Sequence, residues 1–279
     1  MLTRPAGGTF FMHPFDNAIQ LTRIDENRYA GATNRDYGNM VGPYGGITCA
    51  TLLNAVNRHP ARIGEPIALT VNFVSAIAEG DFEIKVKAVR TNRSTQHWTV
   101  QMKSGGDVST TATAVFACRR NTWSAPEATA PADLPLPETL PCQDLTFLPP
   151  WVHRYDLRFA YGDLSAEFDG REQADSKTCL WIRDEPSRVM DFPALAAICD
   201  CFYPRILIRR HRLVPCSTIS LTTYFHADAA LLAEIADRYV LGTARSLNFR
   251  NGYCDQNAGI WSDAGQLLAS SNQMIYYRE

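Results

Sequence analysis

The sequence lacks the features that mark several large classes of protein. No apolar run approaches the ~18 residues that a membrane-spanning helix needs. The formal net charge of −2 gives no electrostatic reason to expect nucleic acid or an anionic membrane as a partner. Residues 1–11 are too few, and too broken by Pro5 and Gly7-Gly8, for a signal peptide. We therefore expect a cytoplasmic protein that binds neither nucleic acid nor membrane.

Several enzyme motifs are missing as well. There is no GxSxG segment, no Walker loop and no GxGxxG, and none of the six histidines is spaced to a Cys or Ser in a known catalytic pattern. The eight cysteines include no CxxC pair and no zinc-like group. Some of them, such as Cys118 and Cys199, sit in apolar stretches, where free cysteine behaves as a small buried hydrophobe. We expect reduced cysteines, no metal and no organic cofactor.

What the sequence has is one series of segments that occurs twice. Residues 69–73 begin a strand, and turns rich in Gly, Asn and Asp divide the strands that follow. Residues 221–225 begin the same series, with turns at matching places. Phe73 and Phe225 are 152 positions apart, which is a small domain rather than a solenoid repeat of roughly 20–50 residues. The length of 279 residues fits two domains of about 100–200 residues each.

Each half contains one apolar helix. Residues 45–56 form an apolar run with Pro60 beyond its end. Asp191 and Pro193 stand at favourable positions for the start of a second helix, which we expect to end near Tyr203 and Pro204. A helix that is apolar nearly all round must be buried, and the sheet is the only element available to cover it.

The remaining segments complete the expected architecture. Four strands are predicted between 67 and 120; in the second half 152–159, 167–171 and 180–183 are strand candidates, and four more strands follow between 218 and 277. Seven prolines between 122 and 150 indicate an extended linker without helix. We predict an α+β double hotdog: two curved antiparallel sheets, each wrapped around a central helix and together forming one continuous surface. Its parts are 1–121, the linker 122–150, and 151–279.

Three polar residues of the second half are candidates for chemistry. Asp200 is the only ionisable residue between Ala194 and Arg205, and burying it costs several kcal/mol unless it is paired; the alternative is an exposed helix end. Gln273 is predicted to point toward the core from its strand, where its amide needs hydrogen-bond partners. The alternative to a functional role is a structural hydrogen bond to the backbone. Thr218 is predicted to share a face with Ser220 and further polar residues, and a threonine in a strand is usually just a good strand former. The helix at 45–56 has no acid, so one working site per chain is expected.

Two further groups suit negatively charged atoms. Gly45 and Gly46 leave the N–H groups of a helix start uncovered, which suits an oxyanion or a phosphate; close packing that only Gly allows is the alternative. Arginine guanidinium groups match phosphate geometry, although the more common explanation of such a charged run is a solvated loop. These candidate phosphate contacts are Arg205, Arg209 and Arg210.

Short segments of this chain resemble the acyl-CoA thioesterase II family, whose members are double-hotdog hydrolases. The resemblance covers most of the chain. Tyr44-Gly45-Gly46 is similar to the family's aromatic-Gly-Gly start of the first helix, and 194–200 is similar to the second helix with its acid. Residues 217–219 and 268–273 resemble the strands that supply the family's Thr and Gln.

The resemblance implies a thioesterase in which Asp200, Thr218 and Gln273 activate a water molecule, with Tyr44, Gly45 and Gly46 at the substrate or oxyanion. It also implies an acyl-CoA or other acyl-thioester substrate. The chain departs from the family at Thr70, where many members have His, and at 205–212, which matches no family motif.

Two other functions remain open on the sequence. A non-hydrolytic acyl-thioester binding protein would hold the same residues in poor geometry. A hotdog dehydratase or hydratase would be expected to use a His with an acid, but the second helix has no His and only His226 lies near the matched strand. We also expect a homodimer, because hotdog sheets have edges to cover.

Overall fold

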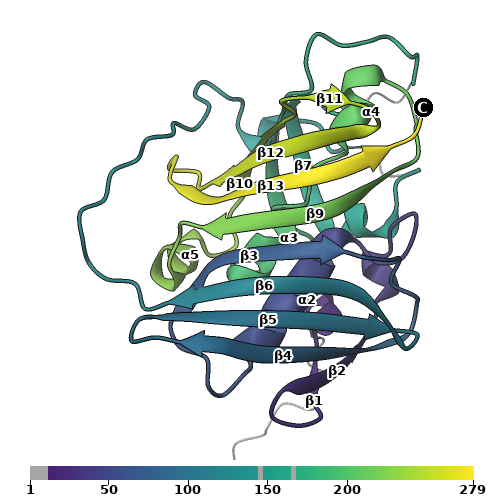
Figure 1. The fold of residues 1–279 in the computed structure, drawn as a ribbon. Coiled ribbons are helices and arrows are strands. Elements are labelled where there is room, and N and C mark those ends of the chain that lie inside the picture. Colours follow the sequence, from purple (N-terminus) through teal and green to yellow (C-terminus); the bar gives the residue numbers. More distant parts are fainter. Residues whose placement is uncertain (1–11, 144–146, 165–167) are drawn as a thin grey trace, which may run out of the picture.

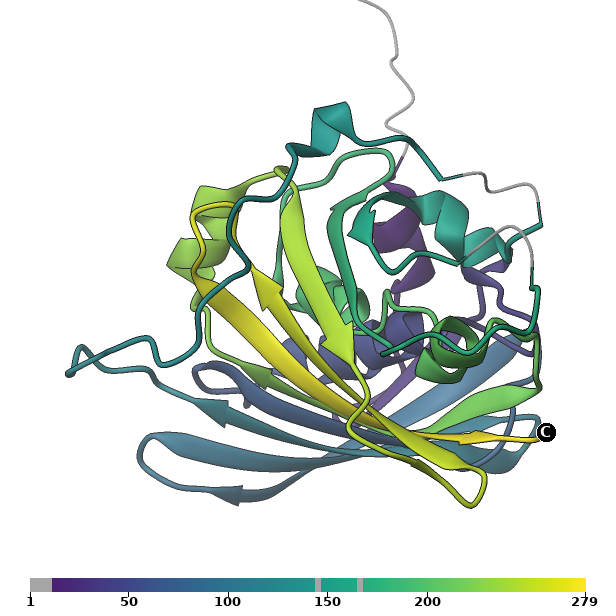
Figure 2. The same ribbon diagram turned by 90° about the horizontal axis from the view of Figure 1, so that it is seen from above.

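One antiparallel sheet dominates the computed structural model, which describes residues 12–143, 147–164 and 168–279. The described residues form a 13-stranded sheet in the order β1-β2-β4-β5-β6-β3-β9-β13-β12-β10-β8-β7, with β11 pairing off this path to β12. Figure 1 shows the strands in this order, and Figure 2 shows the sheet curling around the helices. The main hydrophobic core lies between this inner face and the helices.

In each half a central helix comes before the main series of strands, as the repeated pattern predicts. The elements of the first half are α1 (Pro14–Ala18), β1 (Thr22–Arg23), β2 (Arg28–Ala32), the 3-10 helix η1 (Arg35–Tyr37), α2 (Gly45–Asn57), β3 (Glu65–Phe73), β4 (Asp81–Thr91), β5 (Thr95–Ser104) and β6 (Asp107–Ala117). Those of the second half are η2 (Pro137–Thr139), η3 (Pro150–Arg154), β7 (Tyr155–Tyr161), β8 (Thr178–Asp184), α3 (Phe192–Ile198), α4 (Arg205–Arg210), β9 (Cys216–Phe225), α5 (Ala229–Ile235), β10 (Val240–Arg245), β11 (Phe249–Arg250), β12 (Tyr253–Trp261) and β13 (Leu267–Tyr277).

The two copies join through β3 and β9, which pair antiparallel. Thr70 faces Thr222, its counterpart 152 positions later, and their Oγ1 atoms lie 3.0 Å apart. The pairs on either side are symmetric too, because Leu69 pairs with Thr223 and Val71 pairs with Leu221. A local two-fold axis that relates the two copies therefore passes between Thr70 and Thr222. The predicted double hotdog with one continuous sheet is therefore confirmed.

The central helices are buried for the reason the sequence suggests. Leu52 and Leu53 of α2 have no exposed surface, and burying a leucine side chain contributes roughly 1.5–3 kcal/mol. The helix packs against α3 as well as the sheet. Asp191 caps α3, because its Oδ1 accepts a hydrogen bond from the Ala194 N–H at 2.9 Å.

The predicted end of the second helix near Tyr203 is wrong, because α3 ends at Ile198. The N–H of Asp200 donates to the carbonyl of Ala197 at 3.0 Å, three residues back rather than four, and the Cys201 N–H donates to Ile198 at 2.9 Å. Such bonds tighten the chain into a turn. Asp200 and Cys201 therefore stand on a turn beyond the helix, not within it.

Three other expectations need correction. The charged segment after this turn is not a loop but the short helix α4, whose Ile206 and Leu207 are buried. The Pro-rich linker contains a helical turn, η2, with Pro137 at its first position; the linker passes outside the sheet (Figure 1). Of the expected strand at 167–171, Glu167 lies outside the described residues and 168–171 are not a strand.

The burial of the cysteines agrees with the prediction at Cys199 but not at Cys118, which is exposed. All eight cysteines are free, and only Cys118 and Cys142 are exposed. In the part of the chain that the structure describes, no helix is both long and apolar enough to span a membrane.

Candidate active site

A chain of hydrogen bonds joins the three polar residues of the second half. The Gln273 Nε2 donates to Asp200 Oδ1 at 2.6 Å. The Thr218 Oγ1 donates to Gln273 Oε1 at 3.1 Å. Each bond uses a different end of the glutamine amide, so both neighbours fix its orientation. The structure therefore brings together three residues that come from a turn and two strands.

Gln273 reaches this position from the inner face of β13, where 4% of its surface is exposed. The strand alternation that predicts this face is confirmed, with Ser271 and Ile275 buried beside it. Its hydrogen bonds go to the side chains of Asp200 and Thr218. The alternative that the sequence left open, in which Gln273 bonds only to the backbone, is therefore wrong.

Thr218 lies on the inner face because of a β-bulge. Met274 pairs with Ser220 and Ile275 pairs with Thr218, so Ile219 has no partner in this register. An extra residue reverses the alternation of side chains beyond it. The expectation that Thr218 shares a face with Ser220 is therefore wrong, and simple alternation along the strand could not reveal this.

The carboxyl group of Asp200 titrates near neutral pH. Burial raises its pKa from an ordinary value of 3.8 to about 7, while hydrogen bonds from Gln273 and from the Gly46 backbone N–H oppose that rise. Asp200 as a whole residue is half-buried. A base is most effective when its pKa lies near the working pH, because it is then both available and strong enough to take a proton.

The N-terminus of α2 meets this carboxylate. A Cβ atom added to Gly45 would lie 2.7 Å from Asp200 Oδ2 and 3.4 Å from the Phe73 ring. One added to Gly46 would lie 2.5 Å from the carbonyl oxygen of Ala197. Real Cβ atoms do not approach so closely. Gly46 therefore requires glycine, because it meets a backbone oxygen, whereas a side chain at Gly45 would displace the flexible carboxylate of Asp200. The close-packing explanation thus applies here, and the partners are the end of α3 with the turn after it, together with the Phe73 ring of β3.

Tyr44, the aromatic residue of the same motif, points into the protein. Its side chain is 2% exposed and its ring stacks on Trp151 at 4.2 Å with 7° between the planes. Its hydroxyl donates to the carbonyl of Ala197 at 2.7 Å. Tyr44 therefore lies behind Asp200, inside the core, and we do not propose a substrate contact for it.

The three arginines lie in different environments. Arg205 is fully buried, with hydrogen bonds to Gln256 Oε1 at 2.8 Å, Thr178 Oγ1 at 2.6 Å and two backbone carbonyls. Its N–H groups donate to buried groups of the protein, so we do not propose that Arg205 contacts a phosphate. Arg209 and Arg210 keep partly exposed side chains and form ion pairs at 2.6 Å with Glu172 and at 2.8 Å with Glu279.

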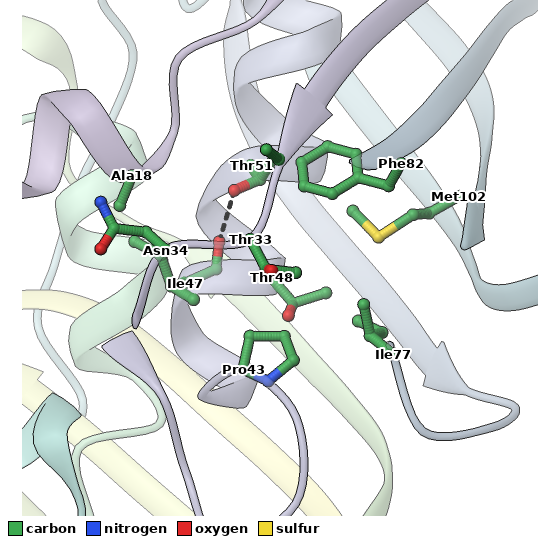
Figure 3. Close-up of a pocket in the computed structure, with 11 residues that line it drawn as sticks. Ala18, Thr33, Asn34, Pro43, Ile47, Thr48, Thr51, Ile77, Phe82 and Met102 are labelled. Atoms are coloured by element: carbon green, nitrogen blue, oxygen red, sulfur yellow. Dashed lines mark hydrogen bonds between the residues drawn. The ribbon is translucent and has the colours of Figure 1, made fainter. Parts of the chain in front are cut away.

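A separate pocket lies on another face of α2, in the first half (Figure 3). Ile47, Thr48 and Thr51 face Phe82 and Met102 across an empty volume of about 280 Å³, part of which is open to solvent. The Thr51 hydroxyl donates to the Ile47 carbonyl at 2.7 Å and is thereby occupied. None of its lining residues is titratable, so the pocket offers no acid–base chemistry of its own.

Sequence reasoning missed two neighbours of the acid. The Phe73 ring lies beside Gly45, and the Cys201 Sγ lies 3.2 Å from the Tyr44 hydroxyl. The repeat contained a signal for Phe73, since it marks the same point of each copy as Phe225. No local pattern distinguishes Cys201 from an ordinary buried cysteine.

The fold and this site define a class: a double-hotdog protein with a titratable carboxylate held between its two copies. Comparison with known proteins agrees. The family model of the acyl-CoA thioesterase N-terminal domain matches residues 34–117, and that of the C-terminal domain matches residues 124–277. The chain belongs to the acyl-CoA thioesterase family and is a thioesterase enzyme.

Solved structures share the same fold. A hotdog-fold protein of unknown function from Alicyclobacillus acidocaldarius is 42% identical with a TM-score of 0.91, over 96% of this chain and 99% of that one. A putative thioesterase II from Thermobifida fusca is 18% identical with a TM-score of 0.81, over 98% and 100%. An acyl-CoA thioesterase II from Mycobacterium marinum is 20% identical with a TM-score of 0.74, over 95% and 98%. No curated protein matches the chain.

Proposed function

We propose that this thioesterase hydrolyses acyl-CoA thioesters with a water molecule activated by Asp200 and oriented by Gln273 and Thr218. The observation that carries the proposal is the hydrogen-bond chain that ends on a carboxyl group whose pKa is about 7. A thioester carbonyl is already electrophilic, so the reaction needs an activated water and a place for negative charge.

The chemistry follows from these positions. Asp200 takes a proton from water as the water oxygen bonds to the thioester carbon, and the carbonyl becomes an oxyanion. The N-cap residue of α2 makes no side-chain cap bond. The Gly46 N–H bonds the Asp200 carboxyl group, so the other N–H groups of this first turn, with the partial positive charge of the helix, stabilise the oxyanion. When the intermediate collapses, the C–S bond breaks and the thiolate takes the proton from Asp200. Acid and thiol leave, and the carboxylate is restored.

Arg209 and Arg210 stay candidates for the phosphates of the substrate, because both are partly exposed near the start of β9. A guanidinium group that leaves a surface carboxylate for a phosphate gains a more highly charged partner. Replacing each with Gln should raise KM for acyl-CoA several-fold and leave KM unchanged for an acyl thioester of N-acetylcysteamine, which has no phosphate. An equal change for both substrates would contradict the assignment.

The deciding experiment measures release of free thiol from short, medium, long and aromatic acyl-CoAs. Turnover is expected for part of this panel, and it should survive exhaustive chelation. Binding of the same thioesters without turnover would favour the non-hydrolytic binding protein. The homodimer and the cytoplasmic location stay predictions; a monomer by light scattering would contradict the first.

A further inference from the structure

The carbonyl oxygen of Ala197 is the point where the two halves meet behind the acid. It accepts the backbone N–H of Asp200 at 3.0 Å and the hydroxyl of Tyr44 at 2.7 Å. The Cα of Gly46 lies so close that a Cβ there would be 2.5 Å from the same oxygen. One atom of the second half is thus shared by the backbone of Asp200 and by the helix start of the first half.

The Tyr44 hydroxyl holds this turn on both sides of the acid. Besides Ala197, it contacts the Sγ of Cys201 at 3.2 Å, so it contacts the residues three before and one after Asp200. The tyrosine itself has little freedom. Its ring stacks on Trp151, and its backbone N–H donates to the Tyr37 carbonyl at 2.8 Å.

Tyr44 is also the residue from which α2 begins. Whatever fixes its side chain to Ala197 therefore fixes the distance between the α2 N-terminus and the turn of Asp200. The Gly46 N–H that bonds the carboxylate is only two residues away from Tyr44 along the chain. Phenylalanine would preserve the stacked ring and lose this connection.

We propose that Tyr44 is a positioning residue: its hydroxyl, through the Ala197 carbonyl and the Cys201 thiol, sets the place of the Asp200 carboxylate against the start of α2. This inference rests on the proposed role of Asp200 as base. It gives the aromatic position of the Tyr-Gly-Gly segment a function that does not involve contact with the substrate. The two glycines supply the space, and the tyrosine supplies the connection.

The test replaces Tyr44 with Phe in the full-length protein. Displacing a reacting group by about 1 Å can cost on the order of 10²-fold, so a smaller displacement should lower kcat by about 10-fold with KM unchanged. The acidic limb of the pH–rate profile should also move, because the contacts that set the titration of Asp200 change. A purely structural role would lower the active fraction without moving that limb.

Tyr203→Phe is the matched control. Its hydroxyl is equally well bonded, to Gln143 Oε1 at 2.6 Å, and it lies three residues beyond Asp200, but its partner is in the linker. This variant should keep both kcat and the pH profile. If both variants lose kcat to the same degree with unchanged profiles, the positioning role is overturned.

A double variant separates the two hypotheses. If Tyr44 acts only through the acid, Tyr44→Phe should cost nothing further in the Asp200→Asn background. An undiminished rate for Asp200→Asn alone would overturn the proposed function itself. A normal loss for Asp200→Asn, with an unchanged kcat and pH profile for Tyr44→Phe, would overturn only the present inference. Should Tyr44→Phe fail to fold, Cys201→Ala tests the same contact from the other side, with the same shift expected.

Discussion

The two copies of the repeated unit share a scaffold and differ at corresponding positions of the sheet. In the second copy, Leu221 pairs with Gln273 and Thr218 pairs with Ile275. In the first copy, Leu69 pairs with Ala114 and Pro66 pairs with Phe116, in the same register. Alanine and proline thus stand where the second copy has Gln273 and Thr218. Even the bulge is repeated, since Ile67 and Ile219 are the residues left without partners.

The helix starts differ in the opposite sense. The first copy begins α2 with Gly45-Gly46 and has no side-chain cap. The second begins α3 with Phe192-Pro193, and Asp191 caps it. The Phe192 ring lies 5.8 Å from the ring of Phe225. Phe225 is the counterpart of Phe73, and beside Phe73 the absence of a side chain at Gly45 leaves room for the Asp200 carboxylate. One aromatic ring therefore fills at α3 the space that a carboxylate takes at α2.

The comparison shows that the two copies share their structural elements and contribute different groups to the candidate site. The sheet, the bulge and the central helix are kept twice because both copies need them to bury a core. The open helix start is kept only in the first copy, and the acid, amide and hydroxyl only in the second. The candidate site therefore needs residues from both halves. We expect the position related to it by the local two-fold axis to have no catalytic activity.

The largest effect should come from removing the carboxylate of Asp200, which has no acidic counterpart in the first copy. Asp200→Asn keeps the shape and loses the base, and general base catalysis contributes roughly 10²–10⁴-fold. The initial rate of thiol release should fall by about that factor with the fold intact by circular dichroism. Thr51→Ala in the acid-free helix α2 serves as the control and should keep nearly the full rate. A fully active Asp200→Asn enzyme would leave the fold assigned and the site unassigned.

A smaller effect should follow when the second sheet is made to resemble the first. Gln273→Ala introduces the residue found at Ala114, and Thr218→Ala removes the neighbouring hydroxyl. Each removes one hydrogen bond around the proposed water, so kcat should fall by about 10–10³-fold. The double variant should lose less than the product of both, because one water cannot be misplaced twice. Strictly multiplicative losses in kcat would show that the two residues act separately.

The helix start offers a third test. Gly45→Ala would place a Cβ 2.7 Å from Asp200 Oδ2, and the flexible carboxylate should move away. We expect kcat to fall by about 10-fold, as for a displacement below 1 Å, while stability changes little because alanine favours a helix by ~1 kcal/mol over glycine. Steady-state kinetics and a melting curve test this; unchanged kcat would mean that the acid is not confined there.

The smallest effect concerns stability and pH. Burial raises the pKa of Asp200 to about 7, so the folded protein binds this proton more tightly than the unfolded chain. Stability from this group is therefore fully present below pH 3.8 and is lost as the pH rises toward about 7. Asparagine has no charge to bury, so Asp200→Asn should raise the Tm at pH 8, by about 2–4 °C for each ~1 kcal/mol. The gain should shrink at pH 5; a gain independent of pH would contradict the raised pKa.

Local patterns determined most of the fold. The strands between 67 and 120, the buried helix that starts at Gly45 and the cap at Asp191 follow from alternation, apolar runs and capping chemistry, which involve residues close in sequence. The repeat itself was visible in the same way, as the pairing of Thr70 with its counterpart Thr222 confirms. Candidate residues could be chosen because a carboxylate or amide in an apolar segment needs a partner.

Only the tertiary structure decided what those partners are. The bulge at Ile219, where β9 pairs with β13, turns Thr218 inward. The early end of α3 places Asp200 on a turn against Gly45, a residue of the other half. Arg205 is buried although a run of charges indicates solvent. Each outcome depends on contacts between distant parts of the chain, and their energies are set by packing and desolvation that no local pattern records.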